Sequence, residues 1–98
     1  MKKIIVKNEF KKDHISREAG ERLRDMIKNA YRKKQKIEID FDQVVIASTS
    51  FFDEGIAKLA LVGWNKDRFD QFVKIRNLNP RDAEVMKKMC QYRGLYQK

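Results

Sequence analysis

The chain has 98 residues and a formal net charge of +9, so we expect one compact domain over residues 1–98 with a preference for acidic partners. One cysteine and one histidine exclude a disulfide framework and a Cys/His metal site within the chain. The apolar run at residues 4–6 is too short for a secretory signal or a membrane span, and a lone thiol fits a reducing compartment. We therefore expect a cytoplasmic protein with no cofactor and no membrane contact.

The first third of the chain predicts a strand followed by a long helix. A β-branched apolar run favours a strand at residues 3–7, and the polar residues 8–15, which include His14, predict a turn. Ser16 suits the N-cap position, where a side-chain oxygen accepts hydrogen bonds from the first turn of a helix. Apolar residues then recur at three- and four-residue spacing, which predicts an amphipathic helix over residues 17–34.

The middle of the chain predicts a second strand and an unusually apolar helix. Strict alternation of apolar and acidic residues favours a strand over residues 36–42. Ser50 is the expected N-cap of the next helix, with Asp53 as its reciprocal partner in a capping box. That helix, over residues 51–64, is apolar almost all round, so it must be buried over a wide arc, under a sheet or against a partner.

The last third predicts a third strand and a third helix. Residues 65–70 read as a polar connection, and residues 72–78 as a strand. Asn79 followed by Pro80 predicts a helix start, because Asn can cap the first turn and Pro lacks only an amide that would have no partner there. Cys90 lies on the apolar stripe of this helix, which favours a small core residue over a reactive thiol.

The order of strand, helix, strand, helix, strand and helix favours the α/β class. Such alternation is typical of a sheet covered by its crossover helices. We expect a small mixed or parallel sheet of about three to five strands with three main helices.

The segment from Asp40 to Glu54 resembles the STAS domain, the fold of bacterial anti-sigma-factor antagonists. In those proteins a strand that ends in Asp is followed by Val and then by Asp-Ser-Ser-Gly at the start of a helix. The segment is more similar to a STAS-like family of unknown function, in which strand-Asp-Phe and Val precede Ser-Ser-Ser-Phe-x-Asp-Glu. The matching residues are Asp40-Phe41, Val44, Ser48-Thr49-Ser50-Phe51 and Asp53-Glu54, with Ser16, Arg17 and Ala19 in the preceding helix. The resemblance implies a STAS-like fold.

The resemblance also suggests a phosphorylation switch. In STAS antagonists a partner kinase phosphorylates the first serine after the Asp, and the complex then breaks. The matching position here is Thr49, although Ser48 replaces the Asp and Phe51 replaces the Gly. Free amides at a helix start favour a phosphate, whereas Asp53 and Glu54 would repel it. Simple helix capping by the three hydroxyl groups is the alternative interpretation.

Arg17 is a candidate structural support. The family pattern pairs an Arg at the start of the first helix with the Asp-Glu of the next one. We therefore expect Arg17 to meet Asp53 or Glu54 and to tie the two helix starts together, with a solvated Arg17 as the alternative.

The leading hypothesis is a non-enzymatic regulatory domain that binds a protein partner. No acid/base pair and no activated nucleophile stand out in the sequence. Domains of the resembled family often accompany histidine-kinase-like ATPases, which suggests such an ATPase as the partner, and a homodimer is a further alternative. The candidate contact residues are Ser48, Thr49, Ser50, Asp53 and Glu54.

The alternative hypothesis is a basic nucleic-acid-associated module. Residues 1–36 hold 13 Lys/Arg against 5 Asp/Glu, whereas residues 37–98 hold 10 against 9. Small size and positive charge also suit a protein encoded by a phage or mobile element. A solvated lysine-rich surface is the competing interpretation, because no aromatic residues are interleaved for base stacking. The candidate contacts, on or just after the first helix, are Arg24, Lys28, Arg32, Lys33 and Lys34.

Overall fold

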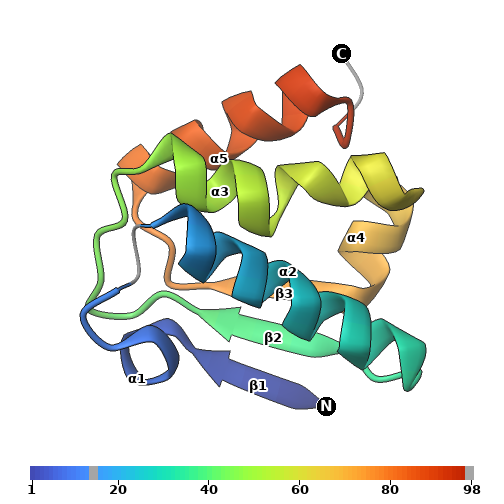
Figure 1. Ribbon diagram of the computed structural model, residues 1–98, viewed down its shortest axis with the longest axis horizontal. Helices are drawn as coiled ribbons and strands as arrows, with labels where there is room; N and C mark the ends of the chain where they lie inside the picture. Colours follow the sequence, from blue (N-terminus) through green and yellow to red (C-terminus); the bar gives the residue numbers. More distant parts are fainter. Residues whose placement is uncertain (14–15, 97–98) are drawn as a thin grey trace.

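The protein is an α/β domain, as the order of predicted elements suggested. The structure, a computed structural model, describes residues 1–13 and 16–96, so His14 lies outside the described residues. In chain order its elements are β1 (Lys2–Ile5), α1 (Val6–Phe10), α2 (Arg17–Arg32), β2 (Ile37–Asp40), α3 (Thr49–Gly55), the 3₁₀ helix η1 (Ala57–Val62), α4 (Lys66–Phe72), β3 (Val73–Arg76) and α5 (Pro80–Arg93) (Figure 1).

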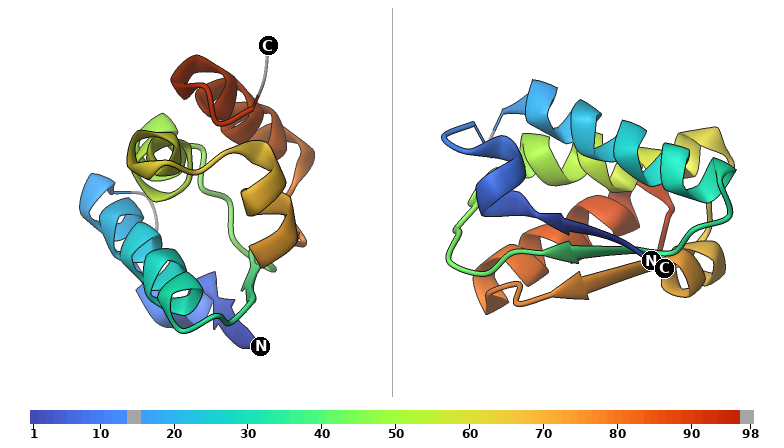
Figure 2. Two further views of the ribbon diagram at one scale, coloured as in Figure 1. Left: turned by 90° about the vertical axis from the view of Figure 1, so that its right-hand side faces the viewer. Right: turned by 90° about the horizontal axis from the view of Figure 1, so that it is seen from below.

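The three strands form one parallel sheet in the order β1-β2-β3. All three expected strands are present, each shorter than predicted. The view from below in Figure 2 shows the strands in front of α2, α3 and α5, so these helices share one face. The opposite face carries a ladder in which Glu38 lies 3.7 Å from Lys3 and 3.1 Å from Arg76. Because this face carries charged side chains, it can be exposed to solvent. Most parallel sheets, in contrast, are covered by helices on both faces.

Two segments that the sequence marked as polar connections contain helices. Part of the turn expected at residues 8–15 belongs to α1, which places Phe10 in the core. The connection expected at residues 65–70 is wrong as well, because most of it is α4. The Asn65 side chain accepts a hydrogen bond from the Arg68 amide and caps α4. Both helices are short, with few apolar residues among charged ones, so their helical period is hard to recognise.

The helix expected over residues 51–64 is two elements, α3 and η1. Its predicted cap is also wrong. Ser48, rather than Ser50, is the N-cap of α3, and its hydroxyl accepts a hydrogen bond from the Phe51 amide at 3.4 Å. The expected capping box is absent because Asp53 turns toward α5 instead of toward the helix start.

The caps of the two long helices are confirmed. The Ser16 hydroxyl accepts a hydrogen bond from the Ala19 amide at the start of α2, and the Asn79 side chain accepts one from the Asp82 amide at the start of α5. Cys90 is fully buried, and burial raises the pKa of its thiol to about 12. Its predicted role as a core residue is therefore confirmed.

The apolar helix α3 is covered within the chain itself. Phe51 and Phe52 are fully buried, and both rings pack against Phe41. On another side α2 approaches so closely that a Cβ added to Gly20 would lie 2.8 Å from the Phe51 carbonyl oxygen. The sheet, α2 and α5 together bury this helix (Figure 2), so its apolar character does not by itself call for a partner.

No helix within residues 1–13 and 16–96 is long and apolar enough to cross a membrane.

Candidate functional site

The loop from β2 to α3 lies at the carboxyl end of the sheet. Figure 1 shows all three strand arrows pointing to this end, where α2, α3 and α5 also begin. Open parallel sheets commonly bind their ligands at this end, because the loops that leave the strands meet there. The hydroxyl triplet therefore lies at a favourable place for recognition.

Asp82 holds this loop in place. Its carboxylate is fully buried and accepts hydrogen bonds from the amides of Ile46, at 2.7 Å, and Ala47, at 2.8 Å. The Asn79 side chain donates a third bond to it at 2.8 Å. Gln43 and Ala47 adopt positive φ angles of 62° and 50°, so the loop has a specific and constrained path. Sequence reasoning placed Asp82 only in the first turn of a helix and missed this long-range role.

The loop and the first turn of α3 present a small mixed surface. Val45 is 61% exposed, and Thr49 is also exposed. Ser48 and Ser50 are half-buried; Ser48 caps the helix, and the Ser50 hydroxyl accepts a hydrogen bond from Arg17 at 3.2 Å. We define the α3 entrance surface as Arg17, Val45, Ala47, Thr49 and Ser50.

The two acids expected at this surface are buried beneath it. Asp53 is 7% exposed and Glu54 is 2% exposed. Asp53 accepts two parallel hydrogen bonds from the Arg93 guanidinium, at 2.8 and 2.9 Å. Both carboxylates are thus engaged within the chain, as buried charged groups usually are. Direct contact of a partner with Asp53 and Glu54 stays a prediction.

Glu54 is surrounded by cations from two helices. Arg17 lies 2.9 Å from a Glu54 carboxylate oxygen and 3.7 Å from Asp53, which is the contact that the sequence suggested. Lys58 also pairs with Glu54, and Arg24 donates a hydrogen bond to the Glu54 carbonyl at 2.6 Å. Arg17 and Arg24 thereby join α2 to α3. Because these cations already compensate the charges of Asp53 and Glu54, the two acids would repel a phosphate on the triplet less strongly than the sequence suggested.

The cations also stabilise the ionised forms of both acids. Hydrogen bonds from Arg93 lower the pKa of Asp53 below its ordinary value. Burial opposes ionisation of Glu54, but hydrogen bonds from Lys58 and Arg17 outweigh it, so the pKa of Glu54 is lowered as well. A group with a depressed pKa in the folded state adds stability above its unfolded pKa, and that stability is lost as the pH falls.

We therefore expect acid to weaken the fold through these two groups. The free energy of unfolding should fall as the pH drops below about 4, the ordinary range of carboxyl groups. Urea unfolding measured across this range should show a shallower pH dependence for an Asp53→Asn/Glu54→Gln variant. A matched Asp25→Asn/Glu84→Gln variant, with both substitutions at exposed positions, should keep the parental slope. Equal slopes for all three proteins would contradict this assignment.

The basic residues expected to contact nucleic acid do not form one stripe. Arg24 turns inward to Glu54 and keeps only 21% of its side chain exposed, and its contact with nucleic acid stays a prediction. Lys28 is half-buried on α2. The exposed members, all at the end of α2, are Arg32, Lys33 and Lys34.

Asp40, the strand acid of the family pattern, has a structural partner. Its carboxylate accepts hydrogen bonds from the Asn77 side chain, at 2.8 Å, and from the Asp42 amide, at 2.9 Å. These bonds lower the pKa of Asp40 and connect the ends of β2 and β3. Across the described ranges 1–13 and 16–96, no group of three or more His, Cys, Asp or Glu side chains is arranged to hold a metal ion.

The comparison with known families agrees with the fold. Residues 19–83 match the family described as STAS-like domain of unknown function (DUF4325). This match runs from the start of α2, through the triplet, to the first turn of α5. No curated protein and no solved structure shows significant similarity to the chain. The protein therefore belongs to the STAS-like domain family, as its sequence predicted.

Proposed function

We propose that this protein is a non-catalytic regulatory domain that binds a protein partner through the α3 entrance surface. The observation that carries the proposal is the exposed Val45, held on a constrained loop four residues before the exposed Thr49. A loop already fixed by Asp82 loses little conformational freedom when it binds, which favours affinity. Membership of a STAS-like family supports a regulatory role.

The charges around the surface suit an acidic partner. The network beneath it contains four cations and two carboxylates, and Arg17 keeps half of its side chain exposed. An apolar contact at Val45 can therefore be combined with an ion pair to Arg17 and hydrogen bonds to the hydroxyl groups. The members of the network are Arg17, Arg24, Asp53, Glu54, Lys58 and Arg93. We propose a histidine-kinase-like ATPase as the partner.

Phosphorylation of Thr49 would regulate the binding of the partner. Its exposed hydroxyl could accept the γ-phosphoryl group of ATP from a partner kinase, which releases ADP and a proton. The phosphate would add a charge of about −2 in the middle of the surface. Arg17 donates a hydrogen bond at 3.2 Å to Ser50, the residue after Thr49, so we expect it to turn toward that charge and away from an acidic partner. Phosphorylation would thus weaken the complex.

The experiment measures binding of a histidine-kinase-like ATPase from the same source by titration calorimetry. Val45→Asp and Thr49→Glu should each weaken binding by about tenfold or more, because each places a negative charge where an acidic partner approaches. Leu61→Asp is the matched control, since Leu61 is 64% exposed on η1, away from the α3 entrance surface. Loss of binding with Leu61→Asp alone, or no binding by the parental chain, would contradict the proposal.

A further inference from the structure

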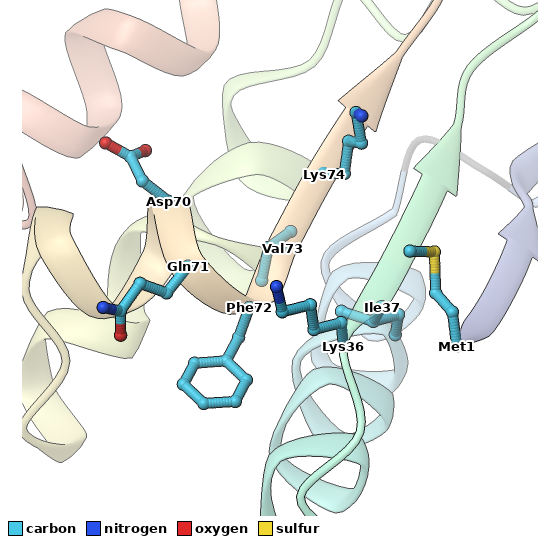
Figure 3. Close-up of a pocket in the computed structure, with 8 residues that line it drawn as sticks. All are labelled: Met1, Lys36, Ile37, Asp70, Gln71, Phe72, Val73 and Lys74. Atoms are coloured by element: carbon cyan, nitrogen blue, oxygen red, sulfur yellow. The ribbon is translucent and has the colours of Figure 1, made fainter.

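A second surface lies at the opposite end of the sheet, where the strands begin. Two hollows meet there, and Phe72 lines both of them. One, shown in Figure 3, has a volume of 260 Å³ and includes Lys36 and Lys74 in its wall. The other, with a volume of 600 Å³, is lined by Tyr31, Arg32, Lys34 and Phe72. We call the combined feature the amino-end groove; its key residues are Tyr31, Arg32, Lys34, Lys36, Phe72 and Lys74.

The lysines of this groove are not neutralised by any described residue, and Arg32 donates a hydrogen bond at 2.9 Å to the uncharged Asn29 side chain. Lys34, Lys36 and Lys74 have no ion pair or hydrogen bond from their side chains within the part of the chain that the structure describes. The acid in the wall, Asp70, already pairs with Lys66 at 2.6 Å. Figure 3 shows the Asp70 carboxylate pointing away from Phe72, while the Lys36 ammonium group lies toward it. The groove therefore carries a positive potential that attracts anions.

Between these cations lies the aromatic ring of Phe72, which packs against another aromatic side chain. The Phe72 ring is half-buried and meets Tyr31 edge-on, with the ring centres 4.9 Å apart. Tyr31 is supported in turn by Trp64, at 5.1 Å between ring centres, and by the Arg68 guanidinium, at 4.8 Å from its ring. The sequence could not show this arrangement, because Phe72 lies far along the chain from the basic end of α2.

We propose that the amino-end groove binds single-stranded nucleic acid. A base would stack on the Phe72 platform, and the flanking phosphates would lie between Arg32 and Lys34 on one side and Lys36 and Lys74 on the other. Cations without acidic partners next to a half-buried aromatic ring form the combination that holds a single strand without reading its sequence. An acidic peptide would use the cations but would gain nothing from stacking.

The first test compares two variants with equal charge loss by fluorescence anisotropy. The probe is a labelled single-stranded oligonucleotide of about 12 nucleotides, with the full chain at about 50 mM salt. The groove variant carries Lys34→Gln, Lys36→Gln and Lys74→Gln. The control variant carries Arg81→Gln, Lys87→Gln and Lys88→Gln, all exposed positions on α5. The groove variant should bind about tenfold more weakly. Its plot of log affinity against log salt should be less steep by about 2, because fewer phosphates are neutralised. The control variant should change affinity by about twofold at most.

The second test examines stacking. Phe72→Leu should weaken binding by about tenfold, while Phe72→Tyr, which keeps an aromatic ring, should bind like the parental chain. Thermal unfolding would verify that both variants are folded. Equal losses in the groove and control variants, tighter binding of a duplex, or equal competition by polyglutamate would each overturn the proposal. Val45→Asp should leave oligonucleotide binding unchanged, so the two proposed sites can fail independently.

Discussion

Gly20→Ala is expected to lower the free energy of unfolding by about 3 kcal/mol, because the added methyl group would collide with the backbone of α3. An ideal Cβ at this position lies 2.8 Å from the Phe51 carbonyl oxygen and 2.9 Å from Glu54 Cβ. Neither atom is the flexible end of a side chain, so α2 and α3 must separate. A domain of this size should then melt about 15 °C lower, which thermal unfolding would measure.

The sign of the stability change in Gly20→Ala shows whether close packing or helix propensity dominates at this position. In an ordinary helix interior, replacing Gly with Ala stabilises by about 1 kcal/mol. A raised melting temperature for Gly20→Ala would therefore contradict the close approach of the two helices. Gly55→Ala should destabilise less, because the nearest atom to its added methyl group, at 3.1 Å, is the movable Leu23 Cδ2.

Asp82→Ala is expected to cost about 3 kcal/mol of stability, because it leaves buried hydrogen-bond donors without an acceptor. The Ile46 and Ala47 amides and the Asn79 side chain all donate to this carboxylate. The loop before α3 should lose its fixed path, so the Ile46 amide should exchange its hydrogen much faster. Chemical unfolding and amide hydrogen exchange would measure the two effects.

The control for Asp82 is Glu84→Ala, which removes an exposed acid from the same helix. It should change stability by about 0.5 kcal/mol at most. Asp82→Ala should also weaken partner binding although Asp82 itself is buried, since the α3 entrance surface depends on the loop it holds. Unchanged Ile46 exchange in Asp82→Ala would show that the loop does not need this carboxylate.

Local patterns in the sequence were sufficient for much of the fold. Alternation over residues 36–42 identified β2, and Ser16 and Asn79 marked the two long helices, because capping and periodicity involve only neighbouring residues. The short helices α1 and α4 were missed, since few apolar residues define each of them. The Asn65 cap was the signal that could have revealed α4.

The site was harder to predict, because its chemistry depends on contacts between distant segments. The family pattern predicted that Arg17 contacts Asp53 or Glu54, but nothing local predicted that these two acids are buried or that Arg93 reaches Asp53 from α5. Asp82 gave no local sign of its bonds to the loop. The apolar residues of α3 suggested a partner, but they are buried in the hydrophobic core of the chain itself.

The most direct test of the central claim is the hydrogen-exchange footprint of the complex with the histidine-kinase-like ATPase. Binding through the α3 entrance surface should slow exchange in residues 43–50, while residues 57–74, which run from η1 through α4 to the start of β3, keep their rates. This pattern would locate the partner on the loop that Asp82 holds. Slower exchange confined to residues 57–74, or no change in residues 43–50, would contradict the proposed function.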